Sequence, residues 1–124
     1  MNTTRVITRK TSADFARMKV AGRCVAAMHA AVRAAIAPGV TTRELDEIAR
    51  GVLVDHGCTS SFLGYGGSQH PFPGVLCTSP NSVIVHGIPD DTRLREGDII
   101  SIDAGAIYEG WHGDAAFTAA VGEV

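Results

Sequence analysis

The sequence predicts an α+β domain in which two helices are followed by an antiparallel sheet. In residues 11–57 apolar side chains recur at helical spacing, which indicates two amphipathic helices. After residue 57 the chain changes to short β-type runs separated by glycine and proline. The 124 residues, of which 45% are hydrophobic and 19% are charged, suffice for one packed domain and exclude a disordered chain.

The first predicted helix covers residues 11–37. Thr11 and Asp14, three residues apart, have the form of a capping box at its start, and the Pro38-Gly39 pair ends it. We interpret the methionines of its apolar stripe as core side chains rather than metal ligands. The stripe consists of Phe15, Met18, Cys24, Val25, Met28, Val32 and Ile36.

The second predicted helix begins at Thr41, with Glu44 as the capping partner, and ends at the His56-Gly57 pair. Its apolar residues have the offsets 0, 3, 4, 7 and 8 that place them on one helix face. These residues are Leu45, Ile48, Ala49, Val52 and Leu53.

The second part of the chain reads as strands and turns. A loop rich in glycine and proline lies between Phe62 and Val75, and a polar connector covers residues 93–98. Four β-type runs are predicted, at residues 75–78, 83–86, 99–106 and 111–121. We expect these runs to pair into the antiparallel sheet.

The most informative feature is a pair of aspartates on the last predicted hairpin. A two-residue turn at Glu109-Gly110 makes the numbers of paired residues sum to 219, so Asp114 lies opposite Gly105. Asp103 and Asp114 then become diagonal neighbours on one face, about 7–8 Å apart at the backbone. A one-residue bulge would separate them, so this prediction depends on regular pairing.

Two carboxylates that converge on the interior face of an apolar hairpin repel each other unless a cation lies between them. One divalent metal ion, or two ions about 3.5–4 Å apart, would relieve the repulsion of Asp103 and Asp114. We expect Gly105 to leave room for such an ion. In the alternative interpretation, one aspartate forms a turn hydrogen bond and the other points to solvent.

Histidines supply the second set of candidates. His86 ends an apolar run and precedes Gly-Ile-Pro, a strand terminus from which an imidazole can enter a cleft and transfer a proton, although a structural histidine is the alternative. Under the hairpin prediction, His112 lies on the same face as the aspartates, where it would support them. His29, His56 and His70 are interpreted as structural or solvated.

Charge and cysteine content bound the function further. A net charge of −2 argues against a dedicated DNA-binding or membrane-surface protein, and no apolar run approaches the roughly 18 residues that span a bilayer. Three cysteines without a CxxC pair favour a reducing cytoplasm. We interpret the basic residues 1–11 as a flexible lead-in rather than a transit peptide, and residues 12–124 as the domain.

Several motifs resemble bacterial type I methionine aminopeptidases, which are pita-bread metallopeptidases. The motifs are NSVIVHGIPDD at residues 81–91, GDIISIDAGA at 97–106 and GWHGD at 110–114. The segments VAGR at 20–23, PGVTTRELD at 38–46 and FLGY at 62–65 fit the same family. The resemblance extends from about residue 12 to the last residue, and it implies the N-terminal half of a pita-bread fold.

The resemblance implies an enzyme that removes the initiator methionine from nascent proteins. Two divalent ions (cobalt, manganese, iron or zinc) would be held by Asp103 and Asp114, and a metal-activated hydroxide would attack the first peptide bond. His86 would bind the substrate near the scissile bond and stabilise the transition state. Tyr65 and Cys77 would line the pocket for the methionine side chain.

The family's remaining ligands, one histidine and two glutamates, come from a second half of the fold. None of the five glutamates of this chain is placed to replace them, so we expect weak or absent metal binding and no appreciable peptidase activity from this polypeptide alone. The alternatives are a proline-specific aminopeptidase of the same fold and a non-catalytic binding module that acts through its exposed sheet.

Partners follow from the same interpretation. The resemblance implies that the substrate is the N-terminal methionine of a nascent peptide. The basic lead-in with Arg5, Arg9 and Lys10 offers a contact with the ribosome, against the simpler interpretation of a solvated tail. A sheet edge that expects a partner predicts self-association and marginal stability for the isolated chain.

Overall fold

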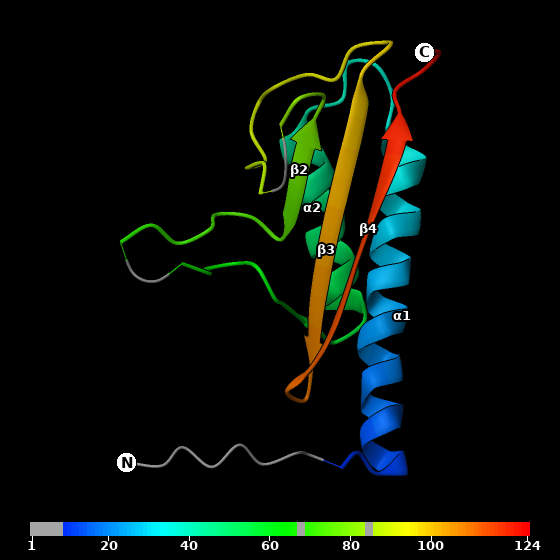
Figure 1. Cartoon of the computed structure of the whole chain (residues 1–124), viewed down its shortest axis with the longest axis vertical. Helices are drawn as coiled ribbons and strands as arrows, with labels where there is room; N and C mark the ends of the chain where they lie inside the picture. Colours follow the sequence, from blue (N-terminus) through cyan, green and yellow to red (C-terminus); the bar gives the residue numbers. More distant parts are fainter. Residues whose placement is uncertain (1–8, 67–68, 84–85) are drawn as a thin grey trace.

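The computed structural model describes residues 9–66, 69–83 and 86–124, and it confirms the predicted fold class. Two helices are followed by a four-stranded antiparallel sheet (Figure 1). The elements are α1 (Ser12–Ala35), α2 (Thr42–Asp55), β1 (Thr59–Ser60), β2 (Leu76–Pro80), β3 (Ile99–Tyr108) and β4 (Trp111–Ala120).

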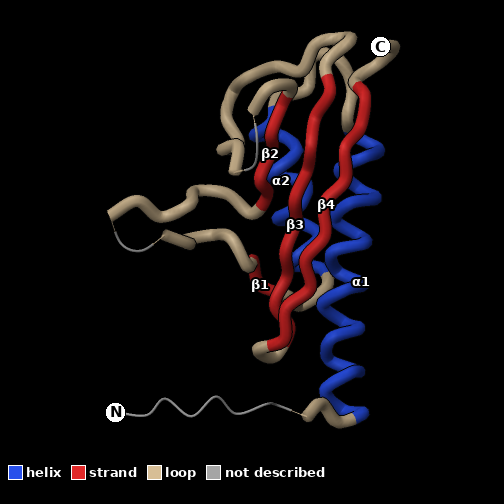
Figure 2. The backbone as a smooth tube through the Cα atoms, viewed as in Figure 1, coloured by secondary structure: helices blue, strands red, loops and turns tan. Residues whose placement is uncertain are grey.

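The molecule has two layers, with both helices on the same face of the sheet (Figure 1). Strand β3 is central: β4 pairs along one side of it, and β2 and β1 pair one after the other along its opposite side (Figure 2). Helix α1 packs on β3 and β4, whereas α2 contacts β1 and β2. The other face of the sheet carries no helix in the described part of the chain, and we call it the open face.

Both helix starts are capped as predicted. The Thr11 hydroxyl accepts the Asp14 N–H and the Asp14 carboxylate accepts the Thr11 N–H, which completes the capping box of α1. The Thr41 side chain likewise accepts the Glu44 N–H at the start of α2. After α2, Gly57 adopts a φ of 65°, the left-handed conformation that ends many helices.

The predicted hairpin is confirmed residue by residue. Tyr108 pairs with Trp111, Asp103 with Ala116 and Gly105 with Asp114. The two turn residues between β3 and β4, a glutamate and a glycine, have φ values of 48° and 82°. Positive φ at both positions is the type I′ geometry that matches the twist of a two-residue hairpin.

The core lies between the helices and the covered face of the sheet. Alternate residues of β3 point into it, and so do most of the predicted helix positions. Phe15 and Ile48 are corrections, because they are 53% and 36% exposed. The fully buried large side chains include Met28, Val32, Leu45, Leu76, Leu94, Ile100, Ile102 and Val121.

The predicted strands differ from the structure in several places. The short strand β1 was not predicted, and β2 and β3 each end two residues later than expected. In the predicted run at residues 83–86, Ile84 and Val85 lie outside the described residues, while Val83 and His86 belong to no strand. Of the predicted lead-in, only residues 9–11 are described.

None of the described helices has both the length and the hydropathy that a membrane crossing requires.

Candidate metal centre

The paired aspartates lie where the hairpin register predicts, but not on the interior face. Asp103 and Asp114 project from β3 and β4 onto the open face, since their neighbours Ile102 and Ala104 point into the core. Asp103 is half-buried and Asp114 is exposed. The two carboxyl groups are therefore side by side with access to solvent.

The electrostatics of this pair call for a cation. Burial raises the pKa of Asp103 to about 7, and the hydrogen bond with Asp114 and the charge of that carboxylate act in the same direction. Its Oδ1 atom is buried and has no hydrogen-bond partner. Because an unpartnered buried oxygen is costly and carboxylates are hard-metal ligands, this donor set fits a divalent ion.

The aspartates open into a pocket of about 400 Å³ on the open face. The pocket gathers all five residues that the sequence analysis assigned to metal or substrate. Four further residues, two of them phenylalanines, complete its wall. The lining residues are Ser61, Phe62, Tyr65, Phe72, Cys77, His86, Asp103, His112 and Asp114.

Cys77 forms a buried part of the pocket wall. It pairs with Asp103 in the β2–β3 ladder, so the two side chains share the open face. Burial and the charges of Asp103, Asp114 and Asp46 raise the pKa of the thiol to about 11. The thiol is therefore neutral at physiological pH and behaves as a small apolar surface.

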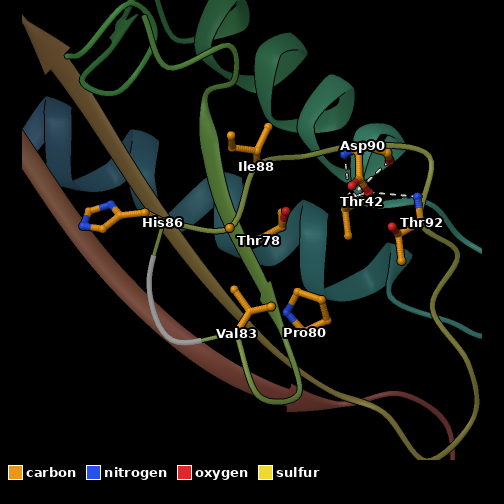
Figure 3. Close-up of a pocket in the computed structure, with 9 residues that line it drawn as sticks. Thr42, Thr78, Pro80, Val83, His86, Ile88, Asp90 and Thr92 are labelled. Carbon is orange, nitrogen blue, oxygen red and sulfur yellow. Dashed lines mark hydrogen bonds between the residues drawn. The ribbon is translucent and has the colours of Figure 1, made fainter. Parts of the chain in front are cut away.

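His86 reaches the pocket from a loop rather than from a strand end. Its φ of 57° lies in the left-handed region, which is uncommon for residues other than glycine but which histidine adopts more often than most. Its Nδ1 lies 4.0 Å from the Cys77 sulfur. A second cavity of about 340 Å³ lies between β2, the start of α2 and the loop that follows His86. Figure 3 shows the His86 ring directed away from the other side chains of that cavity.

The expected free space at Gly105 is absent. A Cβ atom there would lie 2.8 Å from the Ser61 Cβ and 3.2 Å from a ring atom of Phe62, so these two side chains occupy the space. Ser61 also donates its N–H to the Gly105 carbonyl and places its hydroxyl 3.2 Å from Nδ1 of His112. Gly105 therefore admits the pocket wall rather than an ion.

The described residues supply an incomplete ligand set. Among them, no group of three or more histidine, cysteine, aspartate or glutamate side chains is arranged to hold a metal ion. The glutamates serve elsewhere: Glu109 pairs with Arg17 at the hairpin turn, and Glu44 caps α2. The chain thus offers two carboxylates at this site.

The two phenylalanines of the wall have no role among the sequence-based predictions. Phe62 and Phe72 meet edge to face, with ring centroids 6.5 Å apart, across the loop that joins β1 to β2. The sequence feature that could have indicated their place in the wall is the occurrence of two large aromatic residues in a loop rich in glycine and proline, because aromatic side chains usually pack against other groups.

Sequence comparison identifies the family to which this fold and this pocket belong. The profile of metallopeptidase family M24 matches residues 16–124, so the chain belongs to this family. The predicted resemblance is confirmed. "Methionine aminopeptidase 1" of Mycobacterium tuberculosis is 47% identical over 119 residues, which are 95% of this chain and 43% of that protein.

Solved structures agree with this assignment. A methionine aminopeptidase from Thermotoga maritima has a TM-score of 0.89 and 38% sequence identity, over 96% of this chain and 47% of that one. An X-Pro aminopeptidase from the same organism reaches a TM-score of 0.72 at 20% identity over 92% of this chain and 30% of that one, and this likeness shows the fold alone. The chain spans less than half the length of these relatives.

Proposed function

We propose that the open face forms one side of the active site of a metal-dependent aminopeptidase that removes N-terminal methionine from peptides. One observation carries the proposal: a single pocket gathers Asp103, Asp114, His86, Cys77 and Tyr65, although these residues come from three strands and two loops. The methionine aminopeptidases among the relatives support the substrate class.

Asp103 and Asp114 would hold the metal ions. Divalent cobalt, manganese, iron or zinc, when bound, supplies a water activated for attack and polarises the carbonyl of the first peptide bond. The role of the two side chains is to bring two negative charges to one point of a rigid hairpin. Asp103 must give up its proton to become a ligand, because its pKa is about 7.

The rest of the pocket would bind the substrate. His86 can donate a hydrogen bond to the peptide near the scissile bond. The neutral thiol of Cys77, the rim residue Tyr65 and the Phe62–Phe72 pair offer a soft, apolar wall for a thioether side chain. A nascent peptide as substrate implies action in the cytoplasm, close to the ribosome.

We further propose that residues 12–124 form one half of this aminopeptidase domain and that the chain alone has no appreciable peptidase activity. Two carboxylates leave most coordination positions of a transition metal to solvent, so binding should be weak. A histidine and two glutamates from a second half would complete the ligand set.

The test measures two quantities on the purified chain. Titration with Mn²⁺, followed by electron paramagnetic resonance, should show weak binding that Asp103→Ala and Asp114→Ala abolish. The control Glu47→Ala removes an exposed carboxylate from α2 and should leave the binding unchanged. Equal Mn²⁺ binding by all four proteins would contradict the metal site.

Hydrolysis of a methionyl peptide in the presence of cobalt or manganese is the second quantity. The expected rate is no higher than that of Asp103→Ala. A clear excess over this control would show that the chain is active by itself.

A further inference from the structure

Helix α2 carries a stripe of polar side chains directed at the segments beside β2, and two of its three members are buried. Thr42, Asp46 and Arg50 are four residues apart, so they lie on one side of the helix. Thr42 is 2% exposed and Asp46 is 4% exposed. Aspartates are seldom buried unless paired, and the apolar stripe of α2 does not account for this one.

The Asp46 carboxylate holds the backbone that leads into β2. Its Oδ1 accepts the N–H groups of Val75 and Leu76 at 2.8 and 2.9 Å. Its Oδ2 accepts Nε of Arg50 at 2.9 Å. One side chain therefore satisfies two consecutive amides at the start of β2, and it is oriented by a guanidinium on the next helical turn.

Arg50 and Gly74 complete this attachment. Arg50 donates through Nη2 to the carbonyl of Pro73 at 2.9 Å, so the same segment is held at two points. A Cβ atom at Gly74 would lie 2.9 Å from Oδ1 of Asp46, which explains why a glycine stands where the carboxylate approaches the chain.

The held segment connects two residues of the pocket wall. Phe72 lies just before it and Cys77 just after it, and both line the pocket that contains the aspartates. The opposite end of the stripe acts on another segment: the Thr42 hydroxyl accepts the Asp90 N–H at 2.8 Å, in the loop that follows His86 (Figure 3). Helix α2 thus anchors the wall on the side away from the pocket.

We propose that Asp46 is a positioning residue for the substrate pocket: through the amides of Val75 and Leu76, it sets the position of Phe72 and Cys77. The inference rests on the proposed function for the identity of the ligand, a methionine side chain. Asp46 touches neither metal nor substrate, and Arg50 orients its carboxylate.

The experiment uses the three cysteines of the chain as reporters. N-ethylmaleimide labelling is followed by peptide mass spectrometry, which gives a separate rate for each cysteine. Cys77 reports on the wall, while Cys24 and Cys58, both buried elsewhere in the core, report on global opening. Asp46→Ala should raise the Cys77 rate about tenfold or more and leave the other two rates within about twofold.

Two variants sharpen the result. Asp46→Asn keeps an oxygen that accepts the two amides, so it should restore the Cys77 rate to within about threefold of the wild type. Arg50→Ala leaves Asp46 in place and should raise the Cys77 rate by about threefold, so the proposal stays testable if Asp46→Ala does not fold. Glu47→Ala, on the exposed side of the same helix, is the matched control and should change nothing.

Two outcomes would overturn the proposal. One is an unchanged Cys77 rate in Asp46→Ala and Arg50→Ala; the other is an equal rise at all three cysteines, which would make Asp46 a general stabilising residue. A separate arm adds L-methioninamide, which should slow Cys77 labelling in the wild type and do so less in Arg50→Ala. If L-methioninamide gives no protection while the cysteine-specific effect persists, the proposed substrate is wrong and the positioning role stands.

Discussion

The surroundings of single residues in this chain shift their pKa values away from the ordinary ones. Asp103 is the clearest case, because its neighbour Asp114 and partial burial both disfavour its charge. A metal ion bound as proposed would have to compete with that proton. The affinity for metal would then depend on pH near neutrality.

The first residue-scale prediction concerns this competition. Below pH 7 the apparent affinity for Mn²⁺ should rise about tenfold per pH unit, since one proton leaves Asp103 for each ion bound, and it should level off above pH 7. Paramagnetic resonance titrations from about pH 5.5 to about pH 8 measure this slope. A flat profile would mean that Asp103 is already ionised when the metal binds.

A second residue with a shifted pKa, in this case one that resists a proton, lies on the covered face. His29 of α1 packs edge to face against Phe117 of β4, with centroids 4.9 Å apart, and its Nε2 is buried without a partner. Burial lowers the pKa of His29 and the charge of Arg33 lowers it further, against the opposing effects of the Ala115 backbone and Asp114. The imidazole is therefore neutral in the folded chain.

The second residue-scale prediction follows from that shift. The unfolded chain takes up a proton at His29 near pH 6.5, whereas the folded chain resists it, so stability is present above that pH and is lost as the pH falls below it. The melting temperature of His29→Leu should fall less steeply than that of the wild type between about pH 6.5 and about pH 5. The control is His70→Leu, a change at an exposed loop residue, and its melting temperature should fall with pH as steeply as that of the wild type.

At the scale of elements, the loop that carries His86 is held against β2 at Gly87, whose N–H also donates to the Ser79 hydroxyl at 3.2 Å. Thr78 donates its N–H to the Gly87 carbonyl at 2.8 Å, and a Cβ atom at Gly87 would lie 1.9 Å from the Thr78 carbonyl oxygen. Backbone atoms in a paired strand cannot move aside cheaply. The identity of residue 87 therefore decides how closely the loop approaches the strand.

The element-scale prediction is that Gly87→Ala destabilises the chain by about 1–3 kcal/mol, because the loop must leave β2. Gly51→Ala is the matched control: no atom lies within 4 Å of its added Cβ, and a helical alanine should stabilise α2 by about 0.5–1 kcal/mol. Urea unfolding of both variants measures the difference. A cost at Gly87 no larger than about 0.3 kcal/mol would show that the loop does not depend on this contact.

At the scale of the whole molecule, one face and one edge of the sheet have no cover in the described structure. The ten-residue strand β4 pairs only with β3 there, and no helix covers the open face. Long, unpaired edges with few charges bind other strands. In β4, Asp114 is the single acidic or basic side chain apart from the histidine.

The whole-molecule prediction is concentration-dependent self-association. Sedimentation velocity over an approximately hundredfold concentration range should show species larger than the monomer, together with a broad thermal transition. Ala116→Lys, which places a charge on the open face of β4, should shift the distribution toward the monomer. A monomer at every concentration with a sharp two-state melt would exclude this behaviour.

The sequence determined the features that depend on neighbours along the chain. Both helices, their threonine caps and the hairpin register were predictable, because capping, helical periodicity and a two-residue turn involve residues only a few positions apart. The juxtaposition of Asp103 and Asp114 follows from that register. Outside the hairpin, His86 was a candidate from its place after an apolar run, and Tyr65 and Cys77 were assigned from family motifs; the sequence did not show that they meet in one pocket.

Tertiary structure decided everything that rests on contacts between distant segments. It placed the aspartates on the open face, filled the space at Gly105 with Ser61, and buried Asp46 beneath the pocket wall. Periodicity cannot indicate these contacts, since they join residues tens of positions apart and depend on which face the helices cover. The register of the β3–β4 hairpin is therefore predictable from the sequence, whereas the pocket forms only when the sheet and the helices pack together.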